Sequence, residues 1–114
     1  MNVDFVRRVC RSFPYATEAV QWEDDLVFKV GGKMYAVMPL EPAPVKLSFK
    51  CSPEDFAELI ERPGIIPAPY LARAHWVALE SEDAIPAAEL KRRLRASYDL
   101  VLAKLTKKLR AALQ

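Results

Sequence analysis

Lysines alternate with apolar residues in the middle of the chain, between residues 45 and 51. Because successive side chains of a strand point to opposite faces, this pattern predicts a half-exposed strand with Lys46 and Lys50 on its outer face. The same alternation over residues 26–30 places Lys29 outward, and Lys33 follows at a hairpin tip. Lysines repeated on one sheet face suit the phosphates of a nucleic-acid backbone. The sequence therefore predicts a phosphate-contacting face bearing these four lysines.

Aromatic residues add to this predicted face. Tyr35 alternates to the side opposite Met34, and either His75 or Trp76 must face the open side of the sheet. An exposed ring there would stack on a base or lie along a sugar. Arg73 lies close by in the sequence and completes the candidate nucleic-acid surface. The structural alternative is that outward lysines protect the sheet against edge association.

A second candidate site uses the Pro-rich segment of residues 63–70. This segment is too broken by proline for regular structure and too apolar for a solvated linker. Packed against the domain, it would let Tyr70 join His75 and Trp76 around a small-ligand pocket or a protein-interaction surface. The alternative function is therefore that of a ligand-binding or interaction module.

Charge is unevenly distributed along the chain, although the formal net charge is only +2. Residues 1–88 hold nine basic and 13 acidic side chains, a net charge of −4, whereas residues 89–114 hold eight basic and two acidic ones, a net charge of +6. The basic side chains of this final segment are Lys91, Arg92, Arg93, Arg95, Lys104, Lys107, Lys108 and Arg110. The near-neutral total excludes a histone-like binder and leaves room for local, modest contact with an anionic partner.

Catalytic and metal-binding chemistry have little support in the residue pattern. His75 is the single histidine, and Cys10 and Cys51 fall on predicted apolar faces, where burial makes a thiol inert. Two cysteines 41 positions apart exclude a structural zinc motif. Glu23, Asp24 and Asp25 are consecutive and so lack the spacing of a calcium loop. We expect no enzyme activity, no metal and no cofactor.

The expected location is cytoplasmic, with reduced thiols. The chain starts Met-Asn-Val-Asp, with an acid where a signal peptide would carry positive charge, and its longest uncharged run, residues 63–72, holds three prolines. We therefore expect no contact with a membrane. A monomer is favoured.

The elements that must position these side chains follow from periodicity. Residues 3–11 predict a helix capped by Asn2, residues 26–38 a hairpin turning at Gly31 and Gly32, and residues 45–51 a third strand. Ser52 and Pro53 begin a second helix, and residues 75–80 read as a further strand. Helices on one face of an antiparallel sheet, in the order α-β-β-β-α-β-α, make a single α+β domain over residues 1–114.

The last helix is expected to run from Pro86 to the end of the chain. Its roughly 27 residues would span about 40 Å, which exceeds a domain of this size. We therefore predict either a kink near Ala96 and Ser97 or an overhanging end.

Five segments in this order resemble the MmcQ/YjbR family of small bacterial proteins. They are the hairpin of residues 28–36, the strand-to-helix junction of residues 47–54, the run of residues 63–70, the segment of residues 75–77 and the segment of residues 97–101. The resemblance implies a fold like that of the bacterial frataxin homologue CyaY and a role as a double-wing DNA-binding protein. Frataxin-type iron binding is not expected, because the first helix sets Asp4 against Arg7, Arg8 and Arg11 instead of an acidic ridge.

Overall fold

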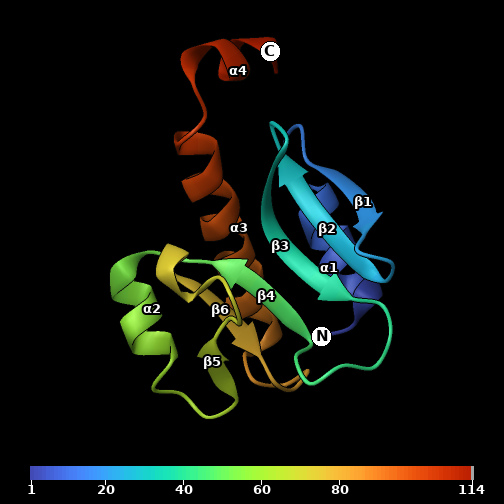
Figure 1. Ribbon diagram of the computed structural model, residues 1–114, viewed down its shortest axis with the longest axis vertical. Coiled ribbons are helices and arrows are strands. Elements are labelled where there is room, and N and C mark those ends of the chain that lie inside the picture. The colour runs from blue at the N-terminus through green and yellow to red at the C-terminus, as the bar shows by residue number, and fades with distance from the viewer. Residues whose placement is uncertain (114) are drawn as a thin grey trace.

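An antiparallel sheet of six strands and four α-helices make up the computed structural model, which describes residues 1–113 (Figure 1). A single 3-10 turn, η1, precedes the last strand. The elements in chain order are α1 Val3–Arg11, β1 Thr17–Gln21, β2 Asp25–Val30, β3 Lys33–Pro39, β4 Leu47–Lys50, α2 Pro53–Leu59, β5 Ile65–Pro67, η1 Ala72–Ala74, β6 Trp76–Leu79, α3 Ala87–Ala103 and α4 Lys107–Ala112. The predicted α+β class is confirmed.

The strand order is β1-β2-β3-β4-β6-β5, and every neighbouring pair is antiparallel. The β2–β3 hairpin turns at Gly31 and Gly32, whose φ angles of 58° and 77° lie in the left-handed region. Such angles match the right-handed twist of the flanking strands and favour glycine. The hairpin therefore forms at the position that the Gly-Gly pair predicts.

Two strands were missing from the predicted order. β1 pairs along the outer edge of β2, and β5 pairs with β6 inside the segment expected to lack regular structure. Pro67 is tolerated in β5 because this strand lies at the sheet edge, where a missing N–H costs no ladder bond. A short edge strand shows no strong alternation, so its sequence signal is weak.

Helix starts follow the capping rules. The Asn2 side chain accepts a hydrogen bond from the Phe5 amide at 2.8 Å, and the Ser52 hydroxyl accepts one from the Asp55 amide at 3.1 Å. Each bond satisfies an amide that has no partner within its helix. Pro53 follows Ser52 in the first helical position, where its missing N–H is harmless.

The main core lies between one face of the sheet and the helices. Its helix side comes from α1, α2 and α3, with Val6, Leu59 and Leu94 all fully buried. In Figure 1, α1 and α3 pass along the sheet and α2 packs beside β6. The opposite face carries a smaller cluster around Trp76, Ala68 and Ala78, formed by strands and the segment before η1. No helix contributes to that second cluster.

A bulge in β3 reverses the predicted direction of Tyr35. Phe28 pairs with Ala36 and Lys29 pairs with Met34, so Tyr35 has no partner in β2. The extra residue turns both Tyr35 and Ala36 to the core side. The Tyr35 ring is fully buried, and its hydroxyl donates to the Cys10 carbonyl at 3.3 Å. The expectation that Tyr35 lies on the exposed face is therefore wrong.

The C-terminal helical region breaks later than predicted. α3 continues through Ser97 without a kink and ends at Ala103. Thr106 then begins α4, its hydroxyl accepting a hydrogen bond from the Leu109 amide at 3.2 Å. Figure 1 shows α4 turned across the end of α3, above the tip of the β2–β3 hairpin. The predicted kink is therefore wrong, and the end of the helical region forms α4, none of whose residues is buried.

None of the helices within residues 1–113 is both long enough and apolar enough to span a membrane.

Candidate functional site

The two ends of the sheet carry opposite charge. Acidic residues gather at the end formed by the β1–β2 turn, the β3–β4 loop and the β6–α3 loop: Glu23, Asp24, Asp25, Glu41, Glu80, Glu82 and Asp83. These segments meet, since the Leu40 amide donates to the Asp24 carbonyl at 2.8 Å and the N-terminal amine donates to the Glu82 carbonyl at 3.0 Å. An anionic partner is therefore disfavoured here.

The other end of the sheet holds a groove of about 570 Å³. It lies where the start of β3, the end of β4, the start of β6 and η1 face the corner between α3 and α4. The hairpin tip touches this corner, because a Cβ built on Gly31 would lie only 2.5 Å from Leu105 Cδ1. The tip and the α3–α4 corner therefore form a continuous wall.

The groove combines an apolar lining with three ammonium groups. Its apolar lining consists of Met34, Leu71, Trp76, Val101, Leu105 and Leu109. Lys33, Lys50 and Lys104 also line it, together with Ala74 and Thr106. No aspartate or glutamate lines the groove, and none of the ion pairs found within residues 1–113 involves the three lysines.

Lys50 is the most enclosed of the three ammonium groups. Its Nζ donates a hydrogen bond to the Ala74 carbonyl at 2.6 Å. Burial, followed by repulsion from the nearby Lys104 ammonium, lowers the pKa of Lys50. Both effects disfavour the charged form, so an anion placed between Lys50 and Lys104 would relieve them.

The predicted lysine face does not form a single surface. Lys33 and Lys50 line the groove, whereas Lys46 lies at the far end of β4, where its Nζ donates to the Ala43 carbonyl at 2.8 Å. Lys29 is half-buried beside Met34, and Arg73 is exposed on η1. The four residue steps from Lys46 to Lys50 span about 13 Å. The alternating pattern predicted the correct face of the sheet. It could not show that the lysines lie at opposite ends of the strand.

Trp76 lies on the predicted face but is only 4% exposed. Its ring packs with Ala68 and Ala78, and Leu71 covers part of this cluster. A base therefore has no exposed indole to stack on, and the predicted stacking role of Trp76 is wrong. Trp76 instead helps to form the apolar wall of the groove.

The predicted pocket of Tyr70, His75 and Trp76 does not form. The Tyr70 side chain is fully exposed, and the His75 ring packs edge-on against Phe56 with 5.5 Å between centroids. His75 ends η1 with a φ of 62°, a left-handed conformation that breaks the strand alternation assumed for residues 75–80. Of the three residues, Trp76 alone lines the groove.

Sequence reasoning missed the helical side of the groove. Lys104 is one of the basic residues of the final segment, and Leu105 and Leu109 continue the apolar stripe of that helical region, but nothing in this pattern joins them to the lysines of the sheet. The sequence feature that could have indicated this part of the groove is the apolar stripe, which extends beyond the length of the sheet. Apolar residues past the end of a domain must either pack elsewhere or line a site.

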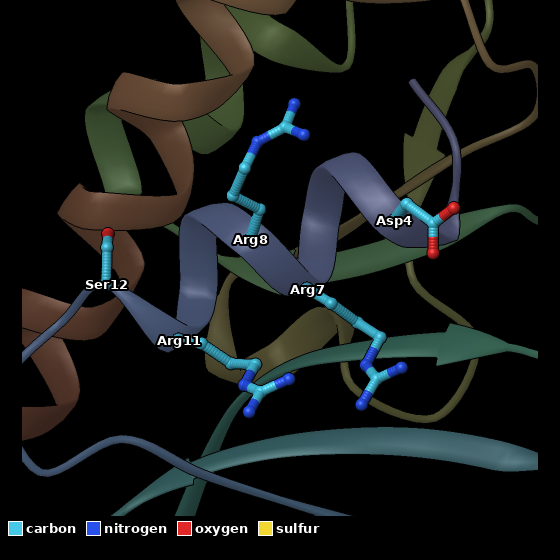
Figure 2. Close-up of a pocket in the computed structure, with 5 residues that line it drawn as sticks. All are labelled: Asp4, Arg7, Arg8, Arg11 and Ser12. Atoms are coloured by element: carbon cyan, nitrogen blue, oxygen red, sulfur yellow. The ribbon is translucent and has the colours of Figure 1, made fainter.

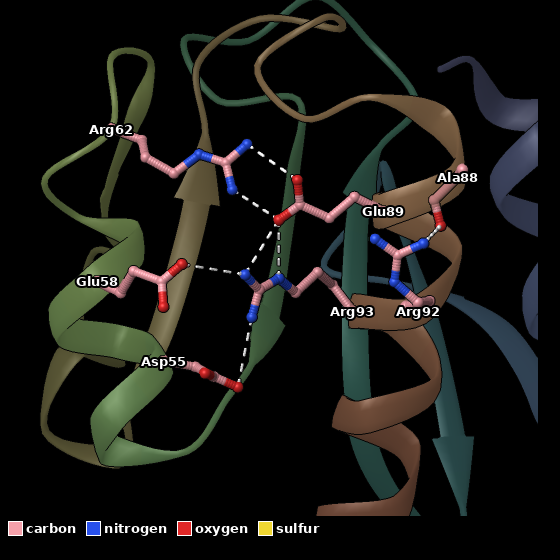
Figure 3. Close-up of polar contacts among 7 residues, drawn as sticks. All are labelled: Asp55, Glu58, Arg62, Ala88, Glu89, Arg92 and Arg93. Atoms are coloured by element: carbon pink, nitrogen blue, oxygen red, sulfur yellow. Dashed lines mark hydrogen bonds and ion pairs between the residues drawn. The ribbon is translucent and has the colours of Figure 1, made fainter.

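Much of the other positive charge is already neutralised or dispersed. Figure 3 shows Arg93 of α3 pointing toward Asp55 and Glu58 of α2, and Arg62 pairing with Glu89. Arg95 pairs with Asp99 at 3.1 Å. These contacts fasten α2 to α3 and cancel charge in the first half of the basic segment. The cations of the second half are Lys104, Lys107, Lys108 and Arg110.

The three arginines of α1 do not converge. Figure 2 shows Arg8 pointing away from Arg7 and Arg11 across the helix. Arg7 is paired with Glu18 of β1 through two of its nitrogen atoms, which lowers the pKa of the Glu18 carboxyl. The shallow pocket beside α1 therefore offers an anion no concerted set of donors.

The two thiols are buried and protonated. Burial raises the pKa of Cys10 to about 12 and that of Cys51 to about 11. Within residues 1–113, no group of three His, Cys, Asp or Glu side chains is arranged to hold a metal ion.

Comparison with known proteins identifies one family. The family model YjbR matches residues 11–100. The crystal structure of protein DR2400 from Deinococcus radiodurans, with the domain DUF419, has a TM-score of 0.87 and 38% sequence identity, covering 98% of this chain and 87% of that one. No curated protein matches the chain.

The fold itself is found in a more distant structure. A Pseudomonas syringae protein has a TM-score of 0.71 at 23% identity, covering 89% of this chain and 99% of that chain. The family model spans most of the chain, and the D. radiodurans protein is similar along almost all of it. The resemblance inferred from five short segments is thereby confirmed, and the chain belongs to the YjbR family.

Proposed function

We propose that the protein binds duplex DNA through its phosphates, using the basic end of the sheet. The contacting groups are Lys33 at the hairpin tip, Lys50 and Lys104 at the groove, and Lys107 and Lys108 of α4. The open sheet face is not the main DNA-contacting surface in this proposal, because Lys46 lies at the acidic end and the rings of Tyr35 and Trp76 are buried.

The separation of charge is the observation that supports this proposal most. Lys33, Lys50 and Lys104 share one groove without an acidic residue in its lining, while seven acids gather at the opposite end. Such a polarity orients the basic end toward a polyanion and repels the acidic end from it. The net charge of +2 understates this effect, because the two ends cancel in the sum.

The residue types favour contact with the backbone of DNA over recognition of its sequence. Reading base edges in the major groove requires arginine, asparagine or glutamine side chains with paired donors and acceptors. The proposed contacts are lysines, which act as point charges on phosphates. Binding is therefore expected to be weak, salt-dependent and similar for different duplex sequences.

Fluorescence anisotropy of a labelled duplex, measured at several salt concentrations, tests the proposal. The logarithm of the affinity should fall linearly with the logarithm of salt concentration, by about 0.9 for each phosphate neutralised. A variant combining Lys107→Ala and Lys108→Ala should bind more weakly and reduce that slope by about 2. Duplexes of unrelated sequence should behave alike.

Lys46→Ala is the matched control, because it removes the same charge at the acidic end. It should leave both the affinity and the salt slope unchanged. Equal losses in the Lys46 variant and the Lys107/Lys108 variant would contradict the placement at the basic end. Absence of binding at low salt would rule out the function.

A further inference from the structure

The apolar lining of the groove has no role in binding phosphates. Six large apolar side chains and Ala74 line it, and Trp76 and Leu105 among them are almost completely buried. A volume of about 570 Å³ lies within the range of small-molecule sites, roughly 300–1,000 Å³. A site with an apolar interior and a few charged groups is typical of ligand pockets.

The charges at this groove define the polarity of its ligand. Lys33, Lys50 and Lys104 come from three separate elements and have no acidic partner in the groove lining. Lys50 and Lys104 line the same groove, and burial followed by repulsion from Lys104 lowers the pKa of Lys50. An anionic group between them would gain two charge-assisted hydrogen bonds.

The ligand therefore needs both an apolar part and an anionic group. A small inorganic anion would satisfy the lysines but leave the apolar lining exposed to water. An uncharged hydrophobe would cover the lining but leave the lysines unpaired. Burial of apolar surface contributes about 25 cal/mol per Å², so a tail that covers the lining adds substantially to what the charges provide.

We propose that this groove binds a small amphipathic anion, with its carboxylate between Lys50 and Lys104 and its hydrocarbon part on Met34, Leu71 and Leu109, above the buried Trp76 ring. The site shares Lys50 and Lys104 with the proposed DNA contact, but Lys107 and Lys108 do not line the groove, so the two sites can be tested separately. It extends the function beyond nucleic-acid binding and does not depend on it.

The α3–α4 corner gives the groove one adjustable wall. No residue of α4 is buried, and Leu109 on the groove side is 40% exposed. A chain of suitable length would cover this side chain, and burial of Leu109 would then hold α4 against the groove. Ligand binding is therefore expected to raise the melting temperature of the protein.

Intrinsic fluorescence provides a direct measurement, since the chain has only two tryptophans. Trp22 is 63% exposed and lies at the turn between β1 and β2, at the opposite end of the sheet. The full chain with Trp22→Phe therefore keeps Trp76 as its one indole reporter. Decanoate, titrated below its critical micelle concentration, should change the Trp76 emission saturably.

Two control compounds separate the contributions of charge and tail. Acetate carries the same head without the tail, and decyltrimethylammonium carries the same tail with opposite charge. Neither should produce the saturable change. A response to the cation equal to that of decanoate would overturn the proposal, as would the absence of any saturable response to decanoate.

Variants locate the site within the groove. Lys104→Met and Leu109→Asn each alter an exposed side chain, so both variants should fold, and each should weaken decanoate binding about tenfold. Lys46→Met is the control and should bind normally. Unchanged binding in both groove variants would overturn the assignment.

The two proposals fail independently. The Lys107→Ala and Lys108→Ala variant should lose DNA affinity while binding decanoate normally. Leu109→Asn should show the reverse pattern. Loss of both activities in the Lys107/Lys108 variant would contradict the separation of the two sites.

Discussion

The hydroxyl of Ser97 donates a hydrogen bond of 2.6 Å to the carbonyl of Tyr35. The same Ser97 oxygen accepts a hydrogen bond of 3.0 Å from the amide of Lys50. Tyr35 is the bulged residue of β3, and β3 and β4 share only two paired positions, at Ala36 and Val37. One hydroxyl on α3 therefore joins β3 to β4 at the position next to their paired residues, and it fixes the backbone of Lys50 at the groove.

Ser97→Ala should lower the free energy of unfolding by about 1–3 kcal/mol. Ser97 is fully buried, so removing its hydroxyl leaves the Tyr35 carbonyl and the Lys50 amide without their partner. Urea denaturation measures the change. Ser12→Ala, which removes an exposed hydroxyl bonded to the Val9 carbonyl, should stay within about 0.5 kcal/mol of wild type. Equal effects of the two substitutions would contradict the bridging role of Ser97.

The fold was largely predictable because its strongest signals are local. Gly31 and Gly32 fix the hairpin, and Ser52 with Pro53 fixes the start of α2. Each signal depends on a few neighbouring residues and on backbone geometry that tertiary packing does not override. The helix capped by Asn2 was predictable for the same reason.

The candidate site was less predictable because it depends on departures from regular alternation and on distant segments. The bulge at Tyr35 and the left-handed φ of His75 each change which way the following side chains point. Neither has a distinctive residue pattern, since no glycine marks the bulge. The meeting of Lys33, Lys50 and Lys104 joins a hairpin tip to a residue 17 positions later and to another 71 positions later, which periodicity within one segment cannot show.

Glu23→Gly should raise the free energy of unfolding by about 0.5–1 kcal/mol. The turn between β1 and β2 holds both Trp22 and Glu23 at positive φ, 49° and 74°, where a side chain is strained. Glycine removes the strain at the cost of a more flexible unfolded chain. Thermal unfolding monitored by circular dichroism should show a higher melting temperature.

The control for this substitution is Glu82→Gly. Glu82 is exposed and also lies in a loop at the acidic end, but its φ is not positive. Here glycine adds only unfolded-state entropy, so stability should fall by about 0.4–1 kcal/mol. A loss of stability in both variants would show that the strain at Glu23 is negligible.

Stability should fall as the pH rises above about 9, because buried thiols keep their protons longer than unfolded ones. The folded pKa values of Cys10 and Cys51 are about 12 and about 11, against an ordinary value of 9.0. Between pH 9 and the folded pKa of each thiol, the unfolded chain binds fewer protons than the folded chain. Each thiol therefore lowers the free energy of unfolding by up to about 1.4 kcal/mol per pH unit in that range. Cys51→Ala should flatten this decline between pH 9 and 11. An identical alkaline slope in wild type and variant would contradict the shifted pKa of Cys51.

At acidic pH, Glu89 should be a main determinant of stability. Its carboxylate accepts hydrogen bonds from Arg62 at 2.6 and 3.1 Å and from Arg93 at 3.1 Å, and the bonds from Arg62 contribute most to lowering its pKa (Figure 3). A lowered folded pKa means that this stabilisation is present above the ordinary pKa of 4.5 and is lost as the pH falls through the folded value.

Glu89→Gln should therefore reduce stability at neutral pH by about 1–3 kcal/mol and give a shallower decline on acidification. Denaturation by urea across the acid range measures both effects, and the two curves should converge once wild-type Glu89 is protonated. Glu61→Gln, which neutralises an exposed carboxylate next to Arg62 in the sequence, should leave the acid limb parallel to that of wild type. A Glu89→Gln curve that stayed parallel as well would mean that Arg62 and Arg93 do not hold the Glu89 carboxylate in its charged form.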